Sequence, residues 1–270
     1  MRKKKKGNWI TWICIIAGLI LCLSTLFLPL ADQMRQSEML KTYEEKADQV
    51  SDAQEEEMLE KAREYNSLLY QTEKAGIQLE GSEILTPQNY LSLLDYSDGM
   101  MGTLEIPKIS VSYPIYHGVS EEILAKGIGH LEDFSLPVGG ENTHAVLTGH
   151  RGLPSSKLLT RLDEMKEGDL FFIRTGSQTL AYQVSDIRVI SPEDVDSLVI
   201  EDGKDQVSLI TCTPYGLNTH RLVVTGDRVP YSEKQQKSVT RSFPSVQEFL
   251  RICVPCFLIS VLLLYMILRR

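Results

Sequence analysis

Cysteine is scarce in this chain outside its two apolar ends. Each end holds two of the five cysteines, and Cys212 is alone in the 220 residues from Asp32 to Arg251. A lone thiol cannot close a disulfide within this middle part, so a small disulfide scaffold is excluded. A zinc-binding module is only a remote alternative, because zinc prefers several ligands at compact spacing and the histidines here are dispersed.

Acidic residues are absent from both ends, and basic residues are outnumbered between them. All 36 Asp and Glu lie within residues 32–251, whereas seven of the 28 Lys and Arg lie outside, which leaves 21 basic residues and a net charge of −15. Because phosphate contacts need a basic surface, a nucleic-acid partner is excluded. The overall content of 43% hydrophobic and 24% charged residues is typical of a globular protein and argues against disorder.

Charged residues are missing from two long apolar runs, residues 9–31 and 252–268. As helices these runs would reach roughly 34 and 25 Å, against a bilayer core of about 30 Å. We therefore expect membrane-spanning helices over 8–31 and 252–268, with a cleaved signal peptide and a buried core helix as the respective alternatives. The basic tails, residues 1–7 and 269–270, then predict two cytoplasmic termini, an extracellular middle part and membrane lipid as a partner.

Proline and glycine are absent between Asp32 and Lys74. Apolar residues recur there at steps of three and four, which predicts a stalk of one or two amphipathic helices over 32–75. Gly76, Gly81 and Pro87 then interrupt the pattern. We interpret residues 76–101 as a connecting or lid-like segment that drapes over the next domain.

The fold class expected for residues 102–231 is mainly β, with a linker over 232–251. Short runs rich in Val, Ile, Leu, Thr and Tyr alternate with Gly, Pro, Asp or Asn, and eight short strands with few helices indicate a closed or nearly closed barrel. The expected strands are Thr103–Ile106, Val111–Tyr116, Thr143–Thr148, Leu170–Arg174, Thr179–Val184, Ile187–Ile190, Gln206–Thr211 and Arg221–Thr225. The expected short helices are Ser120–Lys126, Ser155–Lys166 and Ser191–Leu198.

The chemistry of the chain centres on Cys212, which ends an apolar strand just before Pro214. A strand end at a barrel rim exposes its side chain, as a nucleophile requires, and a thiol also needs a nearby cation or base. Arg221 begins the next strand nine residues later, at the same end of a hairpin, and His150 follows another strand. Taken singly, these residues could equally be a buried cysteine, a surface arginine and a loop histidine.

Three segments around these residues together resemble the signature segments of sortases, the membrane-anchored cysteine transpeptidases of Gram-positive cell surfaces. The segments are Thr148–Gly152 (Thr-Gly-His-Arg-Gly), Thr211–Gly216 (Thr-Cys-Thr-Pro-Tyr-Gly) and Asn218–Leu222 (Asn-Thr-His-Arg-Leu). The stretches Leu136–His144 and Gly152–Pro154 are most similar to the class C, pilin-polymerising branch. The layout of a helical stalk between two apolar ends resembles that branch as well.

The resemblance implies a sortase-like closed eight-stranded β-barrel, with Cys212 as nucleophile, His150 as acid and base, and Arg221 as the catalytic arginine. Such an enzyme cleaves a Leu-Pro-x-Thr-Gly-like sorting signal between Thr and Gly and holds the acyl group as a thioester. It then transfers that group to an amine, which is a pilin lysine in class C enzymes. Neither a cofactor nor a metal is implied.

Two alternatives remain beside the pilin-polymerising assignment. A housekeeping-type sortase would instead anchor surface proteins to peptidoglycan through the amine of a cell-wall precursor, and a non-enzymatic surface scaffold would not need Cys212. Class C sortases also typically carry an inhibitory lid with an Asp-Pro-aromatic triplet, and no such triplet occurs between Gly76 and Gly102. Tyr90 and Tyr96 are the only rings that this segment offers to cover a cleft.

Overall fold

The computed structural model describes residues 9–76, 84–152, 157–240, 242, 250 and 253–261. The chain divides into two compact units, one made of residues 1–34 and 243–270 and the other of residues 35–242. The second unit contains every strand of the described residues and all the residues singled out by their chemistry.

The expectation of two membrane spans is wrong. No helix in the described part of the chain is long and apolar enough to cross a bilayer, which contradicts the predicted two-span location in a cell membrane. Residues 9–31 are the first part of a 39-residue helix, α1 (Trp9–Ala47), which continues into a charged half. In the second apolar run the described helix covers residues 253–261, a length of about 14 Å. The predicted tails, 1–7 and 269–270, lie outside the described residues.

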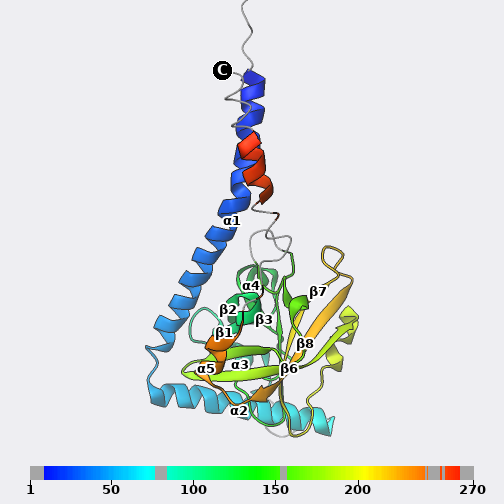
Figure 1. Ribbon diagram of the computed structural model, residues 1–270. Coiled ribbons are helices and arrows are strands. Elements are labelled where there is room, and N and C mark those ends of the chain that lie inside the picture. The colour runs from blue at the N-terminus through cyan, green and yellow to red at the C-terminus, as the bar shows by residue number, and fades with distance from the viewer. Residues whose placement is uncertain are drawn as a thin grey trace, which may run out of the picture. The chain divides into compact units, whose positions relative to one another are not determined.

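Two helices occupy the predicted stalk, and a capping motif separates them. α1 ends at Ala47, and α2 runs from Asp52 to Ala75 (Figure 1). Ser51 accepts a hydrogen bond from the Gln54 amide while the Gln54 side chain accepts one from the Ser51 amide, so the first turn of α2 satisfies its own donors. Gly76 ends α2 in the left-handed conformation, with φ of 63°.

Eight strands close into a barrel in the order β1-β2-β3-β4-β7-β8-β6-β5. The β2–β3 and β4–β7 pairs are parallel and the other pairs are antiparallel. The strands are β1 (Met100–Ile106), β2 (Val111–His117), β3 (Ile128–His130), β4 (Thr143–Thr148), β5 (Leu170–Thr175), β6 (Gln178–Ile190), β7 (Asp205–Thr213) and β8 (His220–Val229).

The expected mainly-β barrel of eight strands is confirmed, but two of its strands differ from the expectation. β3 has only three residues, one of them glycine, so no alternating pattern marked it in the sequence. The runs expected over 179–184 and 187–190 form one 13-residue strand, β6, because a register shift between Val184 and Asp186 lets its pairing with β8 continue.

The short helices also differ in part from the expectation. α4 (Glu121–Lys126) forms as expected, with the Ser120 side chain accepting from the Ile123 amide at 3.3 Å. The helix expected over 155–166 is wrong where it is described: residues 158–161 form turns, and the 3-10 helix η3 covers Leu162–Glu164. The third is a 3-10 helix, η4 (Pro192–Ser197). α5 (Glu233–Ser238) lies within the predicted linker.

α2 lies across the barrel end at which β7 begins (Figure 1). Leu59, Ala62 and Tyr65 of α2 are buried in the main hydrophobic core, which continues inside the barrel. The buried Asn66 side chain also donates to the Leu136 carbonyl at 3.0 Å and accepts from the Leu136 amide at 2.7 Å. The stalk helix α2 is therefore part of the barrel's own core.

The described part of the lid-like segment, residues 84–101, packs into the same core. It contains α3 (Pro87–Ser92) and leads into β1. The Tyr90 hydroxyl lies 3.0 Å from Nδ1 of His130 and accepts from the Gly118 amide at 2.9 Å. His117 lies edge-on to the Tyr90 ring, with Nε2 2.7 Å from the Leu93 carbonyl. Two strands, β2 and β3, thus hold this segment by hydrogen bonds as well as by packing.

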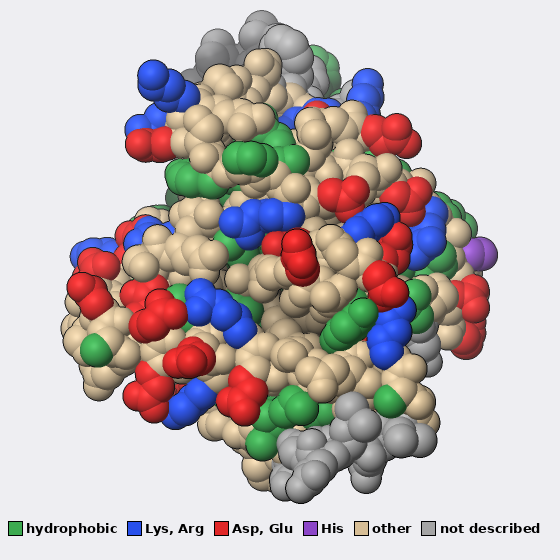
Figure 2. Space-filling model, turned by 90° about the horizontal axis from the view of Figure 1, so that it is seen from below, with side chains coloured by type: hydrophobic (Ala, Val, Ile, Leu, Met, Phe, Trp, Pro, Cys, Tyr) green, Lys and Arg blue, Asp and Glu red, His purple; other side chains and the backbone are tan. Residues whose placement is uncertain are grey.

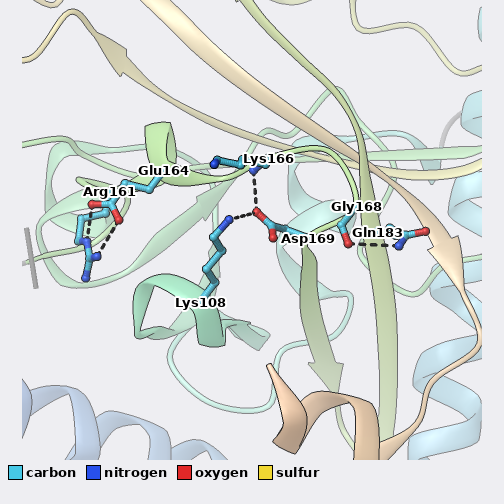
Figure 3. Close-up of polar contacts among 7 residues, drawn as sticks. All are labelled: Lys108, Arg161, Glu164, Lys166, Gly168, Asp169 and Gln183. Atoms are coloured by element: carbon cyan, nitrogen blue, oxygen red, sulfur yellow. Dashed lines mark hydrogen bonds and ion pairs between the residues drawn. The ribbon is translucent and has the colours of Figure 1, made fainter. Parts of the chain in front are cut away.

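Polar contacts fasten the turns beside the barrel. Lys108, in the 3-10 helix η2 (Pro107–Ile109), forms a partly buried ion pair with Asp169, which also accepts from the Lys166 amide at 2.6 Å (Figure 3). Arg161 directly precedes η3, and its guanidinium binds both carboxylate oxygens of Glu164 at 2.7 Å. On the face shown in Figure 2, acidic and basic side chains are interspersed.

Candidate active site

Three neighbouring strands bring Cys212, His150 and Arg221 to one edge of the barrel. β4 runs parallel to β7, and Thr148 is paired with Ile210 two residues before Cys212. β8 runs antiparallel to β7 and begins at this edge, with Arg221 directly opposite Cys212. His150 follows Thr148 by two residues, so the same register places it level with Cys212.

Cys212 lies where β7 emerges from the core. Leu209, Ile210 and Thr211 are at most 2% exposed, whereas Cys212 and Thr213 are partly exposed. Cys212 is a free thiol. The buried part of the strand fixes the backbone, and the emerging part offers the sulfur to a ligand, which is the arrangement that a nucleophile at a strand end requires.

His150 is held near β7 by the backbone that precedes it. The Gly149 amide donates to the Ile210 carbonyl at 3.2 Å, and its carbonyl accepts from the Thr211 hydroxyl at 2.8 Å. These bonds extend the β4–β7 ladder by one residue beyond the strand. The His150 ring is 27% exposed, and its Nε2 lies 3.6 Å from a carboxylate oxygen of Glu121, which is on α4. Glu121 is exposed, so this long contact restrains the ring only weakly.

Arg221 presents its guanidinium beside the turn between β7 and β8. Its Nη1 donates to the His220 carbonyl at 3.2 Å and to the Asn218 carbonyl at 3.4 Å. Both bonds are long and exposed. The two carbonyls therefore compete only weakly for the guanidinium with a stronger acceptor such as a developing oxyanion. The sequence placed Arg221 and Cys212 at the same end of a hairpin, and the strand register agrees.

A second arginine at this edge, Arg151, received no role from the sequence. Its side chain is only 7% exposed, although it follows the partly exposed His150. Nη1 donates to the Thr213 hydroxyl at 3.0 Å, and Nη2 forms an ion pair with Asp163. The signal that could have found it was its place inside the Thr148–Gly152 segment, next to the histidine.

Three of the remaining histidines are buried and have structural roles. Burial lowers the pKa of His130 to about 4, and it also lowers the pKa of His144. Nε2 of His144 lies 2.8 Å from the Ser208 hydroxyl, and its Nδ1 lies 3.0 Å from the Val199 carbonyl. His117 contacts two backbone carbonyls. Among the residues that the structure describes, no three His, Cys, Asp or Glu side chains gather as metal ligands would.

A pocket of about 720 Å³ lies at the opposite end of the barrel. Arg63 and Tyr70 of α2 line it together with Gly140, Asp205 and Arg228 of the barrel. Asp205 begins β7, so the pocket is about 23 Å along the strand from Cys212. It is therefore separate from the edge at which the thiol, imidazole and guanidinium meet.

Comparison with known proteins identifies the barrel. The sortase-domain family model matches residues 104–229, which include Cys212, His150 and Arg221. The crystal structure of sortase C1 from Streptococcus agalactiae aligns with a TM-score of 0.65 at 40% sequence identity, over 73% of this chain and 100% of that one. The chain belongs to the sortase family. Sortases are cysteine transpeptidases, and this sortase is an enzyme of that kind.

Two further relatives show how far this likeness extends. Sortase C from Streptococcus pneumoniae aligns with a TM-score of 0.60 at 41% identity, over 72% of this sortase and 97% of that chain. Sortase D from Bacillus subtilis (strain 168) is 30% identical over 131 residues, which are 47% of this sortase and 63% of the relative. The chain thus spans just under two thirds of that curated relative but almost the whole length of the two class C structures.

Proposed function

We propose that this sortase joins pilin subunits, using Cys212 as nucleophile, His150 as acid and base, and Arg221 as oxyanion donor. The observation that carries the residue assignment is the strand register, which brings the ends of β4 and β7 and the start of β8 to one edge. The chemistry of transpeptidation needs a thiolate, a proton carrier and a stabilising cation at a single place.

The first half of the reaction is acylation of the enzyme. The Cys212 thiolate attacks the Thr carbonyl carbon of a Leu-Pro-x-Thr-Gly-like signal, and a tetrahedral oxyanion forms. Arg221 turns from its long bonds with the turn carbonyls to this oxyanion, for which a permanent cation with several donors is suited. The His150 imidazolium gives its proton to the departing Gly amine as the C–N bond breaks, which leaves a thioester on Cys212.

The second half transfers the acyl group to an amine. A neutral amine attacks the thioester carbonyl, the C–S bond breaks and the Cys212 thiolate leaves. His150 accepts the proton that the amine loses, so it returns to its starting form and the enzyme is regenerated. The proton balance closes on His150 without an external acid or base.

The choice of a pilin lysine as the accepting amine rests on structural likeness. The two class C structures match this sortase at 40–41% identity over nearly their full lengths. The Streptococcus pneumoniae enzyme among them acts on pilin substrates. A cell-wall precursor, the acceptor of a housekeeping-type sortase, is the competing amine. Relatives outside class C also match, among them a sortase A from Streptococcus agalactiae at 31% identity over 117 residues.

One experiment tests both parts of the proposal. The purified full-length chain is incubated with a Leu-Pro-x-Thr-Gly peptide and offered either a pilin domain with its lysine or a short oligoglycine that mimics a cell-wall amine. We expect a mass adduct on Cys212 and a lysine-linked product. An adduct elsewhere, or full cleavage by Cys212→Ala, would refute the nucleophile. Product with oligoglycine alone would refute the pilin acceptor and leave the nucleophile standing.

His150→Ala and Arg221→Ala separate the two supporting roles. Loss of a general acid–base group costs about 10²- to 10⁴-fold in rate, and loss of an oxyanion donor about 10²- to 10³-fold. We expect both variants to fold, because both side chains are partly exposed. Circular dichroism and urea unfolding check that expectation, and activity within threefold of wild type in either variant would remove that residue from the mechanism.

A further inference from the structure

Arg151 is a nearly buried cation at the catalytic edge with no part in the mechanism above. Its side chain is 7% exposed, and the Nε atom is buried without a hydrogen-bond partner. Burying a guanidinium is costly unless charge pairing and hydrogen bonds compensate it. The burial of Arg151 therefore calls for an explanation, which an exposed loop arginine would not.

The contacts of Arg151 join three separate parts of the chain. Nη1 donates to the Thr213 hydroxyl at 3.0 Å and reaches the Cys212 carbonyl at 3.5 Å. Nη2 pairs with Asp163 in η3. The guanidinium carbon lies 6.0 Å from the centre of the Tyr215 ring. One rigid group therefore contacts both residues that end β7, the loop beyond them and the 3-10 helix beside them.

The backbone around Arg151 is fixed on the other side as well. The carbonyl of His150 accepts from the Leu159 amide at 3.3 Å, and the Gly152 amide donates to the Thr160 hydroxyl at 3.1 Å. Gly152 has φ of 87°, and a Cβ there would lie 3.0 Å from the Tyr215 ring. The loop that carries His150 thus passes close against the loop that follows Cys212, and Arg151 is the polar link between them.

We infer that Arg151 is a positioning residue that sets the separation of His150 from Cys212. Arg151 follows His150 in the chain and its guanidinium holds the backbone of Cys212. A shift of the guanidinium therefore moves the imidazole relative to the sulfur. A misplacement of about 1 Å is enough to cost roughly 10²-fold in rate. The inference rests on the proposed catalytic roles of His150 and Cys212.

The planar fork is the feature that this role requires. Lys offers one ammonium, which cannot reproduce two separate nitrogens, one bonded to the Thr213 hydroxyl and the other paired with Asp163. Replacing Arg151 by Lys keeps the charge near Cys212 and removes the geometry. A purely electrostatic role would survive this change, whereas a positioning role would not.

The first test is steady-state kinetics on a Leu-Pro-x-Thr-Gly peptide with Arg151→Lys and Arg151→Ala. We expect kcat to fall by about 10²-fold in both variants, with KM within about twofold of wild type, because substrate contacts are not removed. A kcat for Arg151→Lys within threefold of wild type would overturn the inference. So would a rise in KM with kcat unchanged, which would mean that Arg151 binds substrate.

A second test keeps the inference falsifiable if the Arg151 variants do not fold. Thr213→Val and Asp163→Asn each weaken one contact of the guanidinium. The two side chains bind the same group, so their effects are expected to be coupled through Arg151. We expect each to lower kcat by three- to tenfold and the double variant to lower it by less than the product of the two effects. Multiplicative effects would show that Thr213 and Asp163 act independently and would overturn the role of Arg151.

A matched control lies in the same 3-10 helix. Glu164 neighbours Asp163 in sequence but pairs with Arg161 (Figure 3). We expect Glu164→Gln to keep kcat within twofold, and an equal loss in Glu164→Gln and Asp163→Asn would reduce the effect to a general loosening of η3. Failure of the proposed function looks different, because wild type itself would then form no adduct on Cys212.

Discussion

Acid should destabilise this sortase through His130, a fully buried histidine on β3. Its Nε2 lies 2.8 Å from the Ser135 carbonyl, and its Nδ1 lies 3.0 Å from the Tyr90 hydroxyl. A neutral ring satisfies both, with Nε2 donating and Nδ1 accepting from Tyr90. A second proton would remove the acceptor at Nδ1, so the bond with Tyr90 would have to reverse, and it would place a charge in the core, near His117.

The magnitude follows from the shift in pKa. Burial lowers the pKa of His130 from an ordinary value of 6.5 to about 4. Because the unfolded chain binds a proton more readily than the folded one, the contribution is fully present above about pH 6.5 and is lost as the pH falls toward 4. At about 1.36 kcal/mol per pKa unit, the total loss is about 3 kcal/mol, with about 2.5 kcal/mol of it between about pH 7.5 and 4.5.

The assay compares wild type with His130→Gln, whose neutral amide can donate to the Ser135 carbonyl. The free energy of unfolding is measured in urea at several pH values, so that groups common to both proteins cancel in the difference. We expect wild type to be the more stable protein near neutral pH and its advantage to shrink by about 2.5 kcal/mol on acidification. His220→Gln, at an exposed site, is the control for removing an imidazole.

A wild-type advantage that stays constant within about 0.5 kcal/mol between the two pH values would refute this reasoning. It would mean that His130 has the same pKa in the folded and unfolded states. A growing advantage in acid would be a stronger contradiction, because it would require the protonated ring to be the form that the core prefers.

Three further predictions concern single side chains. Tyr90→Phe should lower the free energy of unfolding in urea by about 1–3 kcal/mol, because the partly buried Gly118 amide loses its acceptor; an unchanged value would mean that water replaces the hydroxyl. Gly226→Ala should cost about 1–3 kcal/mol in the same assay, since its Cβ would lie 2.5 Å from Phe171, and a neutral result would show that the ring can move. Arg221→Lys should slow peptide cleavage by about 10²-fold, and wild-type turnover would reduce Arg221 to a generic charge.

Local sequence patterns predicted the barrel where they were strong and failed where tertiary pairing decides. Most strands carry runs of β-branched and apolar residues that mark them without a structure. β3 has no such run. Its Ile128–His130 backbone is a strand only because it pairs with β2 and β4. The bulge in β6 likewise depends on β8, which keeps pairing on both sides of Ser185. Neither feature has a local signal in the sequence.

The same distinction applies to the candidate site. Cys212 and Arg221 belong to one hairpin, so their proximity followed from a spacing of nine residues. His150 lies 62 residues before Cys212, and the β4–β7 pairing that aligns them is parallel and long-range. Its place could be predicted from resemblance but not from spacing. Arg151 was harder to find, because its place in the Thr148–Gly152 segment was the only sequence signal and its burial depends on contacts with Thr213 and Asp163.

Regulation by the segment before the barrel meets a physical constraint in this structure. The two rings that the sequence offers as a cover, Tyr90 and Tyr96, are 1% and 7% exposed and pack into hydrophobic cores instead. Tyr90 also holds the Gly118 amide and His130. To place either ring over Cys212, residues 84–101 would have to give up this burial, at about 1.5–3 kcal/mol for each large apolar side chain, and leave buried polar groups unpaired. In the described conformation these tyrosines therefore stabilise the barrel, and a ring drawn from this segment is a poor candidate for a reversible plug of the thiol.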